Sequence, residues 1–263
     1  MKHWFTLTDT AKRTAIRFLI GIATLSIVVF GGDRLQRLYY WRKLVKENGL
    51  QEMQQPKVVL GIPLYSRTMG VNGVGTAIDS DTLSRILTNS ELRHLSFLKS
   101  YVELPLGPPE SSVRDLYLVD CELGPTGIEN LNSWVTLRNL GIVGFRWPTG
   151  QLKIIEELGL IRLLVTKAEL TTDDLASIGR LDDLEYLDLE KCILPTGGLR
   201  QLAVLTKLRR LNIAGVDLGC AGQASLANYP ALTTIIVKTT SEAVDLNRIL
   251  IECGGRPICV SVE

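Results

Sequence analysis

The sequence predicts an α/β solenoid that follows a single membrane-spanning helix. The first observation behind this fold class is an apolar pattern, L-x-x-L-x-L-x-x-C-x-L, which is complete in residues 184–194. The second is that the pattern returns at nearly constant intervals after about residue 68. The third is an apolar stretch over residues 14–32 that contains no acidic residue. Together they predict an apolar anchor followed by one elongated body of stacked units.

Eight units fit the pattern, with steps of 24, 21, 24, 23, 24, 24 and 24 residues between their first apolar positions. The units start at Thr68, Leu92, Val113, Leu137, Leu160, Leu184, Leu208 and Leu232. Leu187 and Leu189 occupy alternate positions, so both face one side of a short strand. Apolar residues also recur at every third position over residues 175–184, which predicts a buried helical stripe. Neither surface can be covered within its own unit, so the units must stack around one continuous core.

A repeat of this length and pattern resembles the leucine-rich repeat family, and the resemblance covers about 195 of 263 residues. It implies a horseshoe with a parallel β-sheet on the concave face and short helices on the convex face. The unit length of about 24 residues, and helix starts such as Thr172-Asp173 and Thr196-Gly197, look similar to bacterial membrane-anchored members of the family. One position departs from the family, because its usual asparagine or cysteine is here Thr76, Ser100, Cys121, Phe145, Ala168, Cys192, Val216 and Thr240. No asparagine ladder is therefore expected.

The apolar stretch over residues 14–32 is expected to be a transmembrane helix. Its only charged residue is Arg17, and 19 helical residues span about 28 Å, close to the ~30 Å hydrocarbon core of a bilayer. A cleaved signal peptide is the alternative, with Val29-Phe30-Gly31 as a tolerable cleavage context. Basic residues flank the stretch on both sides, so their count does not fix the orientation. The short basic leader favours a single-pass signal-anchor with the repeats on the non-cytoplasmic side.

Residues 33–55 are expected to form a polar juxtamembrane helix that stops near Asn48-Gly49. Tyr39, Tyr40 and Trp41 suit the lipid headgroup zone, so an interface anchor is expected, with a dimerising or lipid-sensing stalk as the alternative. The expected domains are a basic N-terminal tail (1–13), the transmembrane helix (14–32), the juxtamembrane helix (33–55) and a repeat domain with two caps (56–263).

Both ends of the repeat array need caps. The apolar run Val58-Val59-Leu60 is expected to cover the first end, and a last helix and strand over residues 246–262 the other. In the second unit, two adjacent prolines at residues 108–109 exclude a regular helix, so an extended segment is expected there.

Little in the sequence supports catalysis, a cofactor or a metal site. The motifs H-E-x-x-H and G-x-S-x-G and the P-loop are absent, and the five cysteines include no C-x-x-C pair. The formal charge of +1 argues against a nucleic-acid partner. Cys121 and Cys192 are expected to be buried thiols that lie too far apart to bridge. Cys253 and Cys259 flank a turn and are either a disulfide or two free thiols.

Stacking of the units is expected to align equivalent residues in columns on the uncovered face of the sheet. These columns bring apolar and aromatic side chains together with arginines, as in partner-binding surfaces. The residues expected to contact a protein partner, which the sequence does not identify, are Arg114, Tyr117, Val119, Arg138, Val143, Arg162 and Leu164. The expected function is a membrane-anchored, non-catalytic scaffold. The alternative is a structural or self-associating envelope subunit without a separate ligand.

Overall fold

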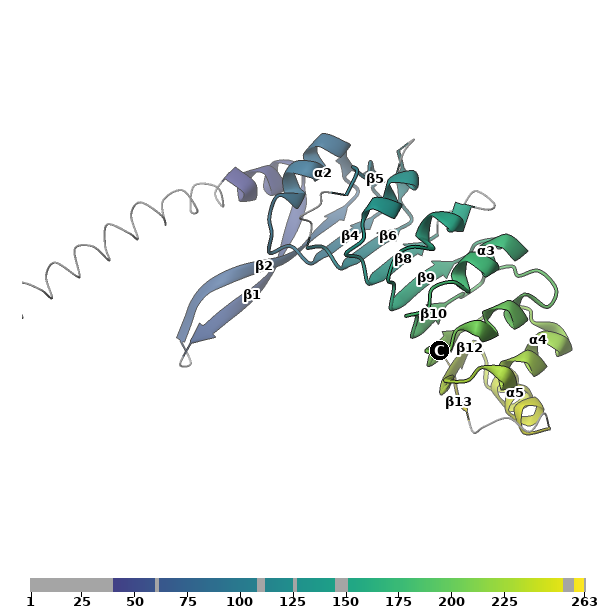
Figure 1. Cartoon of the computed structure of the whole chain (residues 1–263). Coiled ribbons are helices and arrows are strands. Elements are labelled where there is room, and N and C mark those ends of the chain that lie inside the picture. Colours follow the sequence, from purple (N-terminus) through teal and green to yellow (C-terminus); the bar gives the residue numbers. More distant parts are fainter. Residues whose placement is uncertain are drawn as a thin grey trace, which may run out of the picture.

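The computed structural model describes residues 40–59, 62–107, 112–124, 127–144, 151–252 and 258–262. The chain forms a curved stack of units, with one long sheet along its inner side and short helices along its outer side (Figure 1). The strands follow one another across the sheet as β1 (Leu50–Val59), β2 (Ile62–Val74), β4 (His94–Leu98), β6 (Asp115–Val119), β8 (Asn139–Val143), β9 (Arg162–Thr166), β10 (Tyr186–Asp188), β11 (Arg210–Asn212), β12 (Thr234–Val237) and β13 (Cys259–Val262).

The helices and a second, smaller sheet complete the units. The three-stranded sheet contains β3 (Ala77–Ile78), β5 (Tyr101–Val102) and β7 (Glu122–Leu123). The helical elements are α2 (Ser80–Leu87), η1 (Glu129–Ser133), η2 (Gln151–Ile155), α3 (Thr172–Ile178), η3 (Gly198–Val204), α4 (Gly219–Ser225), η4 (Leu226–Asn228) and α5 (Thr240–Glu252), where η marks a 3₁₀-helix.

The strands from β2 to β13 pair in parallel, and their register repeats the spacing of the sequence pattern. Leu95, Leu116, Leu140 and Leu163 are consecutive partners in this ladder, and all four are completely buried. The predicted helical stripe is buried as well, for example at Leu175. These side chains belong to one continuous core. The predicted α/β solenoid, with a long parallel sheet and short helices, is confirmed.

A residue in the left-handed backbone conformation, with positive φ, ends the strand segment of most units. Lys99, Asp120, Lys167 and Lys191 have φ between 49° and 58°, and glycines take the same place in other units. The amide nitrogen of this residue donates to a carbonyl of the next unit, as from Lys99 to Val119 at 2.9 Å. The turn therefore joins neighbouring units while it reverses the chain toward the convex side.

Hydroxyl and thiol groups replace the asparagine ladder at the position after this turn. Ser100 Oγ accepts from the Thr76 amide at 3.1 Å, and Cys121 Sγ donates to the Phe97 carbonyl at 3.2 Å. These bonds join one unit to the unit before it, so hydroxyl and thiol groups supply hydrogen bonds between units in the absence of asparagine. Phe145 lies outside the described residues.

The N-terminal end differs from the expectation. Residues 40–47 are helical, and β1 begins at Leu50. The expected helix over 33–55 is therefore too long, and the repeat domain begins before the expected boundary at residue 56. Trp41 is buried, and its indole nitrogen donates to the Ile86 carbonyl of α2 at 2.9 Å. Trp41 and Val45 thus cap the core rather than face lipid headgroups. Val58 and Val59, expected to form the cap, lie in β1.

β1 and β2 form an antiparallel hairpin that leaves the body of the stack (Figure 1). Only residues 70–74 of β2 pair with β4, and the earlier part of β2 pairs with β1 alone. The part of β2 that pairs with β1 alone has about eight residues, and at roughly 3.3 Å per residue it extends about 25 Å beyond β4.

The opposite end agrees with the expectation, because α5 and β13 follow the last unit and β13 pairs with β12. Near the prolines of the second unit, residues 103–107 are not helical.

Several expectations fall on residues that the structure does not describe. Residues 1–13 and the predicted transmembrane helix over 14–32 are among them, as are Tyr39, Leu60 and Cys253. Among the described residues, none of the helices combines the length and apolar character needed to cross a bilayer.

Candidate functional site

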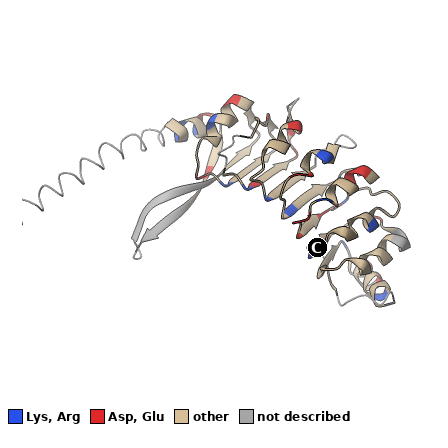
Figure 2. Ribbon diagram, in the orientation of Figure 1, with Lys and Arg blue, Asp and Glu red and all other residues tan. Residues whose placement is uncertain are grey.

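The concave side of the sheet presents the side-chain columns expected from the repeat. The first column contains His94, Asp115, Asn139, Arg162, Tyr186 and Arg210. The second contains Ser96, Tyr117, Gly141, Leu164, Asp188 and Asn212, and the third contains Leu98, Val119, Val143 and Thr166. Basic and acidic residues are mixed along the edge where the strands begin (Figure 2). The columns arise directly from the constant repeat, since each strand places equivalent residues side by side.

The seven residues expected to contact a partner fall into three places on this surface. Tyr117, Arg162 and Leu164 line one hollow. Val119 and Val143 are register partners in β6 and β8, and both are half-buried. Arg114 and Arg138 lie immediately before these strands. The sheet therefore brings the aromatic and apolar residues together, while these two arginines stand along its edge.

Arg138 is held by its own turn. Its guanidinium donates to the carbonyls of Val135 at 3.3 Å and Leu137 at 2.8 Å. Arg114, in contrast, is exposed. Of the two arginines on this edge, Arg114 has the greater freedom to meet a partner.

A hollow of about 330 Å³ lies where β9, β10 and β11 begin. Its lining residues are Tyr117, Arg162, Leu164, Glu185, Tyr186, Arg209 and Arg210. The last four were not among the expected contact residues, although they occupy the same columns, or the position just before them, in later units. The repeat spacing alone was sufficient to include them, because the columns continue past β9.

The absence of a side chain at Gly141 shapes one wall of the hollow. A Cβ atom at this position would lie 2.5 Å from Cδ1 of Tyr117, so the tyrosine ring occupies the space above β8. Burial raises the pKa of Tyr117, the Asp115 carboxylate raises it further, and the Arg162 guanidinium opposes both effects. Tyr117 therefore stays a neutral hydroxyl beside a cation, and its ring is part of the wall.

The other wall is fixed by a buried carboxylate. Asp188 is 7% exposed and accepts from the Tyr186 hydroxyl at 3.0 Å and from Asn212 Nδ2 at 3.1 Å. The Glu190 amide donates to its second oxygen at 3.0 Å. Arg210 lies over the Tyr186 ring, with its guanidinium carbon 5.6 Å from the ring centroid. This network holds the tyrosine ring, and the ring supports the arginine.

A polar group borders the site on the side of β4 and β6. Asp115 accepts a hydrogen bond from Asn139 Nδ2, and its other oxygen lies 3.7 Å from His94 Nδ1. The His94 ring is tilted against Tyr117 with 5.5 Å between the ring centroids. Asp115 is thus already engaged within the column.

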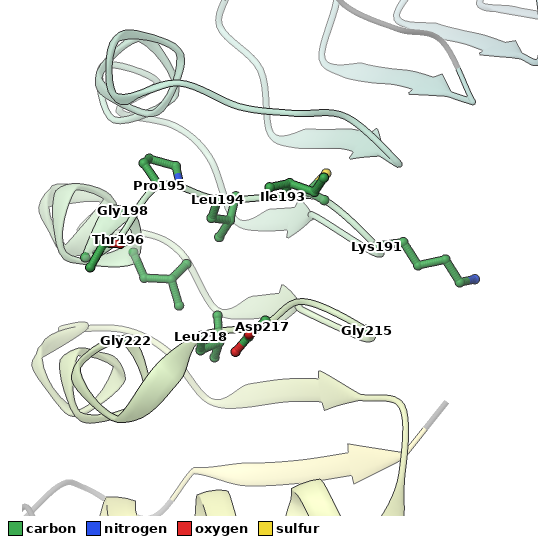
Figure 3. Close-up of a pocket in the computed structure, with 13 residues that line it drawn as sticks. Lys191, Ile193, Leu194, Pro195, Thr196, Gly198, Gly215, Asp217, Leu218 and Gly222 are labelled. Carbon is green, nitrogen blue, oxygen red and sulfur yellow. The ribbon is translucent and has the colours of Figure 1, made fainter.

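A second hollow, of about 450 Å³, lies between two consecutive units on the way from the sheet to the helices (Figure 3). It is lined by Lys191, Cys192, Ile193, Leu194, Pro195, Thr196, Gly197, Gly198, Leu199, Gly215, Asp217, Leu218 and Gly222. Within the described part of the chain, no three histidine, cysteine or acidic side chains come together as a metal site would require.

Comparisons with known proteins give matches to solved structures but none to a sequence family. No family model matches the sequence, and no curated protein sequence matches it. A solved internalin (inlF) from Listeria monocytogenes is 14% identical with a TM-score of 0.42, and the match covers 68% of this chain and 56% of that one. A chain of the mouse RP105/MD-1 complex is 17% identical with a TM-score of 0.44, and the match covers 70% and 35%. This chain thus spans less than two thirds of either protein, and the structural similarity is to leucine-rich repeat proteins.

Proposed function

We propose that this protein is a non-catalytic scaffold that binds another protein through the concave side of its sheet, and that residues 14–32 anchor it in a membrane. The observation that carries the proposal is the set of partly exposed apolar and aromatic side chains in adjacent columns, namely Tyr117, Val119, Val143 and Leu164. Leu98 extends this set and is 36% exposed. Contiguous apolar surface edged by arginine and tyrosine is characteristic of protein-binding sites.

Site-specific photo-cross-linking tests the binding surface. A photoreactive phenylalanine analogue replaces Tyr117 on the concave side or, as the control, Val204 of η3, which is 62% exposed on the helical side. We expect a discrete adduct with a second protein from position 117 and none from position 204. Equal adducts from both positions would contradict the proposal.

Two substitutions separate binding from folding. Tyr117→Asp and Val143→Asp place charge on the apolar surface, where both side chains are half-buried. Either change should abolish capture of the partner while the melting temperature stays within a few degrees of the wild type, since neither side chain belongs to the buried core. A cross-linked product with twice the mass of this chain would instead support the self-associating subunit.

The anchoring part of the proposal comes from the sequence of residues 14–32. The full chain should remain with membranes during alkaline carbonate extraction, and a chain without residues 14–32 should be released. A mature protein that starts after Gly31 would indicate a cleaved signal peptide instead. Protease accessibility of the repeat domain in intact cells then tests its proposed place on the non-cytoplasmic side.

A further inference from the structure

The hollow beside Tyr117 contains more positive charge than its surroundings neutralise. Three guanidinium groups, those of Arg162, Arg209 and Arg210, face one carboxylate, that of Glu185. All three arginines are exposed, and none of them forms a salt bridge with any residue that the structure describes. Arginine groups that lack an acidic partner are available to an external carboxylate.

The acidic residues nearby are engaged elsewhere. Asp183 pairs with Lys207 at 2.6 Å, and Glu190 pairs with Lys191. The Asp188 carboxylate accepts the three hydrogen bonds described above, from Tyr186, Asn212 and Glu190. The three arginines of the hollow are therefore not neutralised by ion pairs with these acidic residues.

We propose that this hollow selects an acidic, extended segment of the partner protein, an inference that rests on the concave surface being the binding surface. Arg162 and Arg210 start strands that are two positions apart in the sheet, so their Cα atoms are about 9.6 Å apart at ~4.8 Å per strand. Carboxylates two residues apart on an extended peptide are separated by roughly 6.6 Å. Two long arginine side chains can converge on that spacing, with bidentate hydrogen bonds to each carboxylate.

The apolar parts of the hollow favour a peptide over a nucleic acid. Leu164 and the rings of Tyr117 and Tyr186 supply flat apolar surface between the cations. The whole chain has a formal charge of only +1, which gives little net attraction for a continuous phosphate backbone. Two glutamate side chains on one face of an extended segment would satisfy both kinds of surface, since their methylene groups can lie over the apolar parts while their carboxylates reach the arginines.

The experiment uses the full chain in detergent micelles and a fluorescein-labelled hexapeptide of alternating glutamate and leucine with blocked ends. The matched probes replace every glutamate by glutamine or by lysine. We expect the glutamate peptide to bind at least about tenfold more tightly than either of the other two, with affinity that falls as salt is added. Equal binding of the glutamate and glutamine peptides, or tighter binding of a single-stranded oligonucleotide, would overturn the proposal.

Substitutions of single arginines test whether the glutamate peptide binds at the hollow. Arg162→Gln and Arg210→Gln should each weaken the glutamate peptide about tenfold, whereas Arg200→Gln, an exposed arginine on η3, should leave binding unchanged. Arg210→Glu should shift the preference toward the lysine peptide. Melting curves of the four variants establish that they are folded. If none of the four variants changes the affinity for the glutamate peptide, the assignment is refuted.

Photo-cross-linking from position 117 separates this inference from the proposed function. If the partner adduct persists in Arg162→Gln and Arg210→Gln, the concave surface still binds the partner and the acidic ligand is wrong. Loss of the adduct in both arginine variants, but not in Arg200→Gln, supports the acidic segment. Absence of the adduct in the wild-type chain counts against the concave surface itself.

Discussion

Cys192 is a single side chain that links neighbouring units, and its burial should make the fold sensitive to alkaline pH. Its thiol is buried and donates to the Val165 carbonyl at 2.9 Å, one unit earlier in the chain. Burial raises its pKa from 9.0 to about 11, and burial raises the pKa of Cys121 as well. Both thiols should therefore remain protonated and unreactive in the folded protein.

The first prediction concerns the pH dependence of stability. Between pH 9 and about 11 the unfolded chain has released the Cys192 proton and the folded chain still holds it. Stability from this group is complete below the unfolded pKa and falls as pH rises, by up to about 1.4 kcal/mol per pH unit and 2–3 kcal/mol in total. Urea unfolding of the wild type and of Cys192→Ser at about pH 8, 9 and 10 measures the two slopes.

We expect Cys192→Ser to flatten the slope, whatever its stability at neutral pH. Other groups that titrate in this range, including Cys121, are common to both proteins and cancel in the comparison. Equal slopes would show that the thiol of Cys192 has no raised pKa in the folded state.

At the residue scale the sequence predicted the concave columns but not the hollow. The constant spacing fixed which residues are neighbours, so Tyr117 and Leu164 were correctly placed on one surface. The shape of the hollow depends on Gly141, which lets the Tyr117 ring lie across β8. A missing side chain has no apolar signal of its own, and its effect becomes visible only when neighbouring strands are in register.

Among the elements, α3 shows how helix starts are fixed. Its N-cap is Thr171, whose hydroxyl accepts from the Asp174 amide at 3.2 Å, while Asp174 Oδ2 accepts from the Thr171 amide at 3.0 Å. Asp174 Oδ1 also accepts from the Leu152 amide of η2 at 3.3 Å. The sequence placed the helix start at Thr172-Asp173, and α3 does begin at Thr172, with Thr171 before it as the N-cap.

The second prediction orders three substitutions in this helix start. Asp174→Ala removes the capping box and leaves the Leu152 amide without this acceptor, so it should cost about 2 kcal/mol or more. Thr171→Ala removes only the cap hydroxyl and should cost about 1 kcal/mol. Asp173→Ala, at an exposed position of the first turn, should cost about 0.5 kcal/mol. Urea unfolding gives the three values, and an Asp173→Ala cost equal to that of Asp174→Ala would disprove the order.

Among the N-terminal elements, the helix ends at the expected stop near Asn48-Gly49, but residues 50–55, expected in the same juxtamembrane segment, lie in β1. Residues 51–55 are Gln-Glu-Met-Gln-Gln, which have neither the alternation nor the β-branched residues of a typical strand. Pairing with β2 makes this segment extended, from Leu50 opposite Gly73 onward. Strand formation here is a tertiary effect, and local sequence carries little sign of it.

For the whole molecule, each unit contacts mainly its neighbours, so stability is close to a sum of unit and interface terms. The periodic core was predictable because every unit repeats the same residues at the same spacing. The N-terminal cap was not, because Trp41 reaches α2 across 45 residues with no counterpart in the repeat. Its aromatic neighbours and the preceding apolar stretch suggested a membrane interface instead.

The third prediction follows from this nearly one-dimensional arrangement. Trp41 is 7% exposed and closes the first unit. Trp41→Ala should therefore lower the free energy of unfolding of this unit by about 3–5 kcal/mol, through lost burial and the lost hydrogen bond to Ile86. Trp41→Phe keeps an aromatic ring in the cap and should cost about 1–2 kcal/mol, because the indole hydrogen bond and part of the buried ring area are lost. The Ile86 carbonyl still accepts from the Asn89 amide at 3.3 Å. The loss should be local, because distant units keep their own interfaces. Hydrogen exchange should accelerate in α2 and β4 and stay unchanged in β10 to β12. Uniform acceleration along the stack would mean that the units unfold together, and that the cap stabilises all of them equally.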